Sequence, residues 1–140
     1  EPSEAGEITY EDAIAHAELE NLRHVDWSII DRPVVVAHAG AFGHGPAEVD
    51  RDVLPLLLTL MGRHDHLMTD LSGLDTAVLC AVLGRLDLDR VVFGSDALYF
   101  APWEAMVRLA LALEDAVPDV EDAFLKIASL NPLRLLGEEG

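Results

Sequence analysis

Three polar side chains stand at the ends of three short apolar runs. His38 follows the run Pro33–Ala37, Asp70 closes the run Leu67–Thr69, and Asp96 comes shortly after Val91–Phe93. An imidazole and two carboxylates are groups that bind divalent metal ions and transfer protons in catalysis. These three residues are therefore our candidates for a catalytic or metal-binding site.

Each candidate also has a structural alternative. An Asp after a strand is often the N-cap of the following helix, and this alternative stays open for Asp70. His38 is alternatively a core histidine whose ring nitrogen bonds a backbone carbonyl. Asp96 fits a capping role less well, because the next helix start, at Pro102, lies well beyond it. Each signal alone is weak, and their common position gives them weight.

The segments that must position these side chains alternate between two patterns. Short continuous apolar runs bounded by turn residues are typical of strands covered on both faces, and the longer Leu-rich segments between them are typical of helices. We expect strands at Pro33–His38, Leu67–Leu71 and Arg90–Gly94, and helices at about Asp50–Met61, Leu74–Leu83, Trp103–Ala116 and Val120–Ser129. This alternation predicts an α/β fold with a parallel sheet, as one domain over residues 1–140.

Parallel sheets bring the carboxyl ends of their strands to one rim, where ligands bind in open sheets and barrels alike. His38, Asp70 and Asp96 all fall at that rim of the expected sheet. Glycines follow each strand end and allow the backbone to turn sharply and to approach a ligand closely. The sequence thus predicts a single site to which three adjacent strands contribute.

Local signals place several helix starts. Residues Thr9–Asp12 resemble a capping box that opens a helix running to about His24. Pro55 is expected in the first turn of its helix, where a missing N–H does no harm, and Pro102 at the start of the next long helix. Asn131 is expected as the N-cap of a final turn that Pro132 begins.

The chain is strongly acidic, with a net charge of -17. Such a surface repels nucleic-acid phosphates and anionic lipid, so we expect neither as a partner. Lys126 is the only lysine among nine basic residues. Two explanations stay open: adaptation to high salt, in which self-repulsion is screened, or an acidic outer face without such a meaning.

The composition also bears on the cellular setting. Hydrophobic residues make up 51% of the chain, as in globular domains, and no apolar run reaches the roughly 18 residues of a membrane span. The N-terminus lacks the pattern of a signal peptide. A single cysteine, Cys80, excludes an intrachain disulfide, and we expect a reduced, cytoplasmic location. The chain has no initiator Met, so we consider that it is cut from a longer protein.

Four stretches resemble one enzyme family when taken in order and spacing: PVVVAHAG, HLMTDLSG, RVVFGSDALYF and LKIASLNPLRLLG. They are similar to the C-terminal part of the metal-dependent amidohydrolases. The branch they resemble most includes the aminocarboxymuconate-semialdehyde and resorcylate decarboxylases. The resemblance extends from about Pro33 to Gly137. The GSD ending of the strand and the closing N-P-x-R-L-L-G helix are fairly specific as a pair.

The resemblance implies a fold, a reaction and a set of site residues. The fold would be a partial (β/α)8 TIM barrel in which the three βα units are the last three. Asp96 would bind a catalytic divalent metal, with zinc as the first expectation and manganese as the alternative, and His38 would act on the substrate or the metal-bound water. Asn131 would be structural. The resemblance gives no firm role to Asp70, Ser72 or Ser95. From their places near the strand ends, we expect His44, Asp70, Ser72, Ser95 and Tyr99 to line the pocket for a small-molecule substrate, with Leu98 to Phe100 as an apolar wall.

The chain also departs from the family pattern. The family's other ligands, an H-x-H after the first strand and a His after the fifth, would lie upstream of Glu1. The H-x-H that is present, His64 to His66, precedes a strand, so it would lie at the opposite end of the barrel and we interpret it as a decoy. A whole barrel takes about 250 residues. We therefore expect that this chain alone is inactive.

Two hypotheses follow for the chain. The first is the C-terminal portion of a hydrolase or non-oxidative decarboxylase, which either self-associates or pairs with a missing N-terminal half. The second is a truncated, non-catalytic α/β module that acts by self-assembly or partner binding. An isolated three-stranded sheet has two open edges, so both hypotheses predict association of some kind.

Overall fold

Three parallel strands form one sheet in the computed structural model, which describes residues 19–138. The strands are β1 (Val34–Val36), β2 (Leu67–Asp70) and β3 (Val91–Val92), and they lie side by side in chain order. Thr69 in the central strand is in register with Val36 on one side and Val91 on the other. The expected α/β fold with three parallel strands is confirmed, and each strand is shorter than the sequence predicts.

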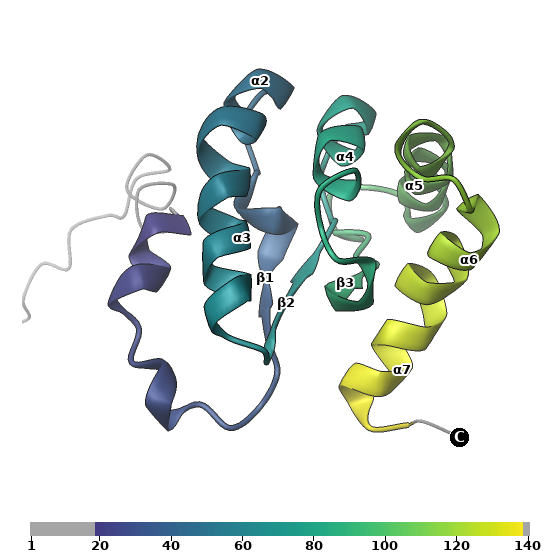
Figure 1. Cartoon of the computed structure of the whole chain (residues 1–140). Coiled ribbons are helices and arrows are strands. Elements are labelled where there is room, and N and C mark those ends of the chain that lie inside the picture. Colours follow the sequence, from purple (N-terminus) through teal and green to yellow (C-terminus); the bar gives the residue numbers. More distant parts are fainter. Residues whose placement is uncertain (1–18, 139–140) are drawn as a thin grey trace, which may run out of the picture.

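Helices follow each strand. The chain passes across the molecule from η1 at one side to α7 at the other (Figure 1). The expected helix from Thr9 lies mostly outside the described residues. The helical segments are η1 (Leu19–His24), η2 (Trp27–Ile29), η3 (Ala37–Gly40), α2 (Pro46–Glu48), η4 (Val49–Val53), α3 (Leu54–Arg63), α4 (Thr76–Leu83), η5 (Leu88–Arg90), α5 (Pro102–Ala116), α6 (Val120–Leu125), η6 (Lys126–Leu130) and α7 (Asn131–Leu136).

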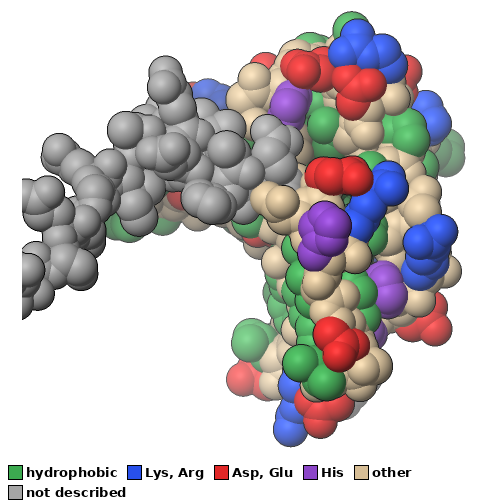
Figure 2. Space-filling view, turned by 90° about the vertical axis from the view of Figure 1, so that its left-hand side faces the viewer, with side chains coloured by type: hydrophobic (Ala, Val, Ile, Leu, Met, Phe, Trp, Pro, Cys, Tyr) green, Lys and Arg blue, Asp and Glu red, His purple; other side chains and the backbone are tan. Residues whose placement is uncertain are grey.

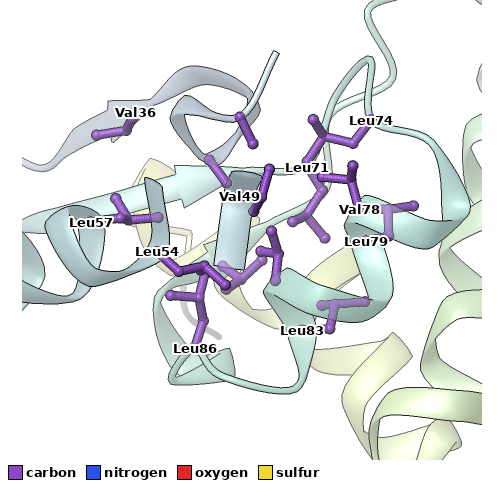
Figure 3. Close-up of a cluster of buried hydrophobic side chains, with 14 of the residues drawn as sticks. Val36, Val49, Leu54, Leu57, Leu71, Leu74, Val78, Leu79, Leu83 and Leu86 are labelled. Atoms are coloured by element: carbon purple, nitrogen blue, oxygen red, sulfur yellow. The ribbon is translucent and has the colours of Figure 1, made fainter. Parts of the chain in front are cut away.

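The two faces of the sheet differ in what covers them. Alternate side chains of a strand point to opposite faces. On one face, Val36, Leu67 and Val91 join the hydrophobic core together with leucines and valines of α3 and α4, which gather there (Figure 3). On the other face, Val35 is 36% exposed, whereas Met68 and Val92 are buried. The main hydrophobic core therefore lies on one face of the sheet, and Val35 is the exposed residue of the other.

Two long helical segments contain a π-helical stretch just before a proline. Val49–Val53 precedes Pro55, and Lys126–Leu130 precedes Pro132. Proline lacks an N–H and its ring clashes with the carbonyl four residues earlier, and a π-type widening relieves that clash within a helix. Pro55 is the second residue of α3, in its first turn as expected, and α2 and η4 precede α3 without a break.

The position of Asn131 differs from the prediction that it is an N-cap. Its backbone is helical (φ -67, ψ -43), and its side chain is 2% exposed. The side-chain nitrogen donates to the carbonyl oxygens of Leu88 at 2.7 Å and Val91 at 2.6 Å. Asn131 therefore ties the C-terminal helix to the turn that leads into β3. The structural role that the resemblance implies for it agrees with these contacts.

Arg90 joins three elements at the amino end of the sheet. Its guanidinium donates to the carbonyls of Met61 at 2.6 Å, His64 at 2.5 Å and Leu67 at 2.9 Å. These carbonyls belong to the end of α3, the turn after it and the start of β2. A single guanidinium therefore satisfies acceptors that the helix end would otherwise leave open.

Charged groups of both signs are mixed with hydrophobic side chains on the face that carries the N-terminal elements (Figure 2). Exposed ion pairs such as Arg85–Asp50 at 2.8 Å and Lys126–Asp89 at 2.8 Å occur on the described surface. None of the helices between residues 19 and 138 has the length and apolar character needed to cross a membrane.

Candidate functional site

The turn after β1 holds its backbone in an uncommon conformation. Val36 ends the strand, and His38 (φ 56) and Ala39 (φ 52) both lie in the left-handed region, followed by Gly40 (φ 65). Side chains with a Cβ rarely occupy this region, and it carries a cost of order 1–3 kcal/mol per residue where it does. The surrounding contacts must therefore hold His38 in place, which is common at functional sites.

Asp70 supplies the central contact of that turn. Its Oδ1 atom accepts hydrogen bonds from the backbone N–H of His38 at 3.0 Å and from Ser72, through N–H at 2.9 Å and Oγ at 2.6 Å. The N-cap of α4 is Asp75, which accepts from the N–H of Val78. Asp70 therefore does not cap the helix, and it links the turns that follow β1 and β2.

The imidazole of His38 lies against the turn that follows β2. Its Nδ1 atom is 2.8 Å from the carbonyl oxygen of Ser72 and 2.9 Å from the hydroxyl of the same residue. The ring of Phe42 packs beside it, with centroids 5.1 Å apart. One ring nitrogen is thus bound to a backbone carbonyl, as the structural alternative for His38 expects, yet the side chain is only half-buried.

Asp96 approaches His38 over Gly73. A Cβ added to Gly73 would lie 3.4 Å from Asp96 Oδ2 and 3.4 Å from His38 Nδ1. The two side chains therefore lie no further apart than twice that distance. Gly73 has φ +67, a conformation that glycine adopts at no steric cost. The structure thus brings together the residues that follow β1 and β3, across the turn that follows β2.

Asp96 is also the third described non-glycine residue with a positive φ, at 54°. Its carbonyl accepts from the N–H groups of Tyr99 at 2.8 Å and Phe100 at 3.0 Å, which closes a turn around it. Within residues 19–138 its half-buried carboxylate receives no hydrogen bond from another side chain. The carboxylate is therefore held at the rim by its backbone and is open to a ligand.

Gly94 allows β2 and β3 to approach each other at this rim. A Cβ at this position would meet the Cβ of Ser72 at 3.0 Å and Oδ1 of Asp70 at 3.3 Å. Contacts this short force a shift of neighbouring atoms. The sequence indicates that glycines at strand ends matter, but it does not show that the side chains of Asp70 and Ser72 fill the space beside Gly94.

Three other residues were predicted to line the pocket, and their side chains make contacts other than those of His38 and Asp96. His44 lies in the loop before α2 and pairs with Glu48, the last residue of α2, at 3.1 Å. Ser95 lines a small pocket against α5, together with Phe100 and Arg108. Tyr99 is 79% exposed. Within residues 19–138, Tyr99 contacts Asp96 through its backbone N–H, and no hydrogen bond or ion pair joins the side chains of His44, Ser95 and Tyr99 to those of His38 and Asp96.

The loop expected as an apolar wall divides into two parts. Leu98 is 95% exposed and, like Tyr99, projects away from the described residues. Phe100 instead turns back, and the guanidinium of Arg108 lies 5.4 Å from its ring centroid. Only Phe100 therefore packs against the body of the protein. Phe42, which contacts His38, is a site neighbour that sequence reasoning missed, because nothing local marks it.

The His64–His66 pair lies at the amino end of β2, away from the rim. Trp27 stacks on His64 with ring centroids 4.6 Å apart, and His66 lies 5.7 Å from the same indole. Nε2 of His66 is buried and has no hydrogen-bond partner within residues 19–138. This arrangement is a packed aromatic cluster at the end of the sheet opposite to His38 and Asp96.

The rim supplies only part of a metal site. Catalytic zinc sites take three protein ligands. No group of three His, Cys, Asp or Glu residues within residues 19–138 is arranged to hold a metal ion. The free carboxylate of Asp96 has the chemistry of one ligand, with the His38 imidazole nearby, and any complete site would need donors from outside the described residues.

Comparisons with known proteins identify the family. The sequence model of the amidohydrolase family matches residues 30–137, which include all three strands and every candidate site residue. No curated protein and no solved structure matches the chain significantly. Members of the amidohydrolase superfamily are generally metal-dependent hydrolases or decarboxylases that use divalent metals. The chain belongs to the amidohydrolase family.

Proposed function

We propose that this chain is the C-terminal portion of an amidohydrolase-type (β/α)8 barrel that acts on a small-molecule substrate. The reaction is hydrolysis or non-oxidative decarboxylation. Asp96 is a ligand of the catalytic metal, with zinc first and manganese as the alternative, and His38 is the acid–base group. The observation that carries this proposal is the approach of His38 and Asp96 over Gly73, at the carboxyl ends of parallel strands.

The shape of the sheet supports the barrel. Barrel strands are covered by helices outside and face one another inside. Here the helices gather on one face, while Val35 on the other face is 36% exposed. Strands β1 and β3 are the outer strands of the described sheet. A further strand beside β1 would cover the second face and would bring an additional strand end to the rim, whereas the outer edge of β3 is partly occupied by the C-terminal segment.

The roles of the two residues follow from their surroundings. A divalent metal, when bound, lowers the pKa of a water ligand or polarises the substrate. Asp96 would hold such a metal through its free carboxylate, since no side chain of residues 19–138 competes for it. His38 would transfer a proton at its second ring nitrogen, Nε2, because Nδ1 is engaged by Ser72. Such proton transfer contributes typically 10²–10⁴-fold to a rate.

Zinc titration of the purified protein tests the site. We expect Asp96→Asn to weaken zinc binding by about tenfold or more, because loss of a residue that only orients a metal ligand already costs about that much. Asp65→Asn, which removes an exposed carboxylate beside the His64–His66 pair, is the matched control and should leave the affinity unchanged. Isothermal titration with each variant gives the comparison. Stoichiometric zinc that Asp96→Asn does not disturb would refute the assignment.

The coding sequence upstream of Glu1 provides a second test. We expect a strand that ends in H-x-H and a later strand that ends in His, because these would complete the ligand set. A start codon close to Glu1, together with no zinc binding by the wild-type protein, would overturn the enzyme proposal.

A non-catalytic module is the second candidate. It is favoured by exposed apolar side chains along α5, where Trp103 is 69%, Val107 is 49% and Leu111 is 50% exposed. These positions recur at a helical spacing and lie on one side of the helix. Sedimentation analysis that finds association together with an absence of metal binding would favour this candidate.

A further inference from the structure

We infer that Asp70 is a positioning residue that fixes His38 in the tautomer with a proton on Nδ1, which leaves Nε2 as the free nitrogen at the rim. This inference deepens the proposed function and rests on His38 being its acid–base group. It replaces the expectation that Asp70 lines the substrate pocket.

The tautomer follows from the partner of Nδ1. A carbonyl oxygen can only accept a hydrogen bond, so the 2.8 Å contact with the Ser72 carbonyl requires a proton on Nδ1. The Ser72 hydroxyl, 2.9 Å from the same nitrogen, accepts from it as well. In the neutral ring Nε2 then carries the lone pair. In water neutral histidine prefers the opposite tautomer, so the site reverses the intrinsic preference.

Asp70 assembles the acceptors that select this tautomer. Its Oδ1 atom accepts a hydrogen bond from the Ser72 hydroxyl at 2.6 Å, so the lone pairs of the hydroxyl oxygen face the imidazole. The same atom accepts a hydrogen bond from the Ser72 backbone N–H at 2.9 Å. This bond orients the backbone of Ser72, which carries the carbonyl that faces Nδ1. One carboxylate oxygen thereby orients both groups that face Nδ1.

The same oxygen also holds the backbone that carries the imidazole. The His38 N–H donates to Asp70 Oδ1 at 3.0 Å, and His38 is in the left-handed region at φ 56. Without this bond the strained turn after β1 loses its contact with β2. Asp70 therefore fixes the ring and the turn together, as outer partners do for histidines in metal sites.

Nitrogen-15 NMR of histidine-labelled protein tests the inference above the pKa range of histidine. Long-range proton–nitrogen correlations distinguish the two tautomers and do not depend on activity. We expect wild-type His38 to show protonated Nδ1. Asp70→Ala should shift His38 toward protonated Nε2, whereas Asp70→Asn, whose Oδ1 still accepts hydrogen bonds, should restore the wild-type pattern.

Asp26→Ala is the matched control. Asp26 makes the same kind of turn, accepting from the N–H of Ser28 at 3.1 Å and from its hydroxyl at 2.6 Å, but with no histidine attached. It should leave the His38 signals unchanged. A wild-type His38 with protonated Nε2 overturns the inference even if Asp70→Ala does not fold. The zinc titration of Asp96→Asn tests the proposed function, and the tautomer of His38 tests this inference. Loss of zinc binding in Asp96→Asn, with the His38 tautomer retained, would show that the two proposals can be tested separately.

Discussion

The side-chain nitrogen of Asn131 lies 2.6 Å from the carbonyl oxygen of Val91, so the closing helix is bound to the last strand of the sheet. The N–H of Phe93 donates to the carbonyl of Ile127 at 2.9 Å on the same side. The outer edge of β3 is thus partly covered by the C-terminal segment. This contact places β3, and with it Asp96, relative to the helices.

Asn131→Ala should destabilise the protein. The substitution removes two hydrogen bonds: the Leu88 carbonyl keeps the Val91 N–H as a donor, whereas the buried Val91 carbonyl loses the Asn131 donor. An unsatisfied buried group costs roughly 1–3 kcal/mol, so we expect a loss of about that size. Urea unfolding followed by circular dichroism measures it. Leu136→Ala in the same helix, where the side chain is 70% exposed, should change the free energy of unfolding by less than about 0.5 kcal/mol. Equal effects of the two substitutions would contradict this account.

Gly94→Ala should disturb the rim. The added methyl group meets Ser72 Cβ at 3.0 Å, and overpacking of this kind costs about 1–3 kcal/mol. Gly62→Ala is the control, because nothing lies within 4 Å of its Cβ position and it lies in α3. We expect this control to be neutral or stabilising by up to about 1 kcal/mol. Thermal unfolding of both variants decides, and a Gly94→Ala protein as stable as Gly62→Ala would be inconsistent with the close approach.

The Cys80 thiol should react slowly in the folded protein. Burial, followed by the charge of Asp115, raises its pKa above the ordinary value of 9.0. Because the pKa is raised in the folded state, the contribution of Cys80 to the free energy of unfolding is fully present below the ordinary pKa. It is lost as the pH rises through the folded pKa. We expect a disulfide reagent to modify the folded protein at least about tenfold more slowly than the urea-unfolded chain at the same pH. Because Cys80 is the only cysteine, the reading is unambiguous, and equal rates would disprove the prediction.

Salt should stabilise the protein. With a net charge of -17, self-repulsion acts against the compact state. Raising sodium chloride from 0.01 M to 1 M shortens the screening length from about 30 Å to about 3 Å. We expect the midpoint of thermal unfolding to rise over this range, with choline chloride giving the same rise if screening is the cause. An unchanged midpoint would mean that the acidic surface has no bearing on stability.

Local chemistry in the sequence determined the order of the elements. Apolar runs bounded by turn residues indicated all three strands, and Pro102 marked the start of α5 as found. The common rim of His38 and Asp96 followed from parallel strands alone. The same local reasoning placed Asn131 at an N-cap, because it cannot see that a π-helical segment lets a helix continue into a proline.

Only the tertiary structure decided what these side chains contact. The bond from His38 N–H to Asp70 Oδ1 joins residues 32 positions apart, and no local pattern distinguishes it from an N-cap. The places of Gly73 and Gly94 beside other side chains, and of Phe42 beside His38, depend likewise on how the turns after separate strands pack together. The sequence by itself therefore determined which groups reach the rim, because strand patterns and turn residues act locally. Their distances, their tautomer and their strain were decided by packing between strands, which no single stretch of the chain contains.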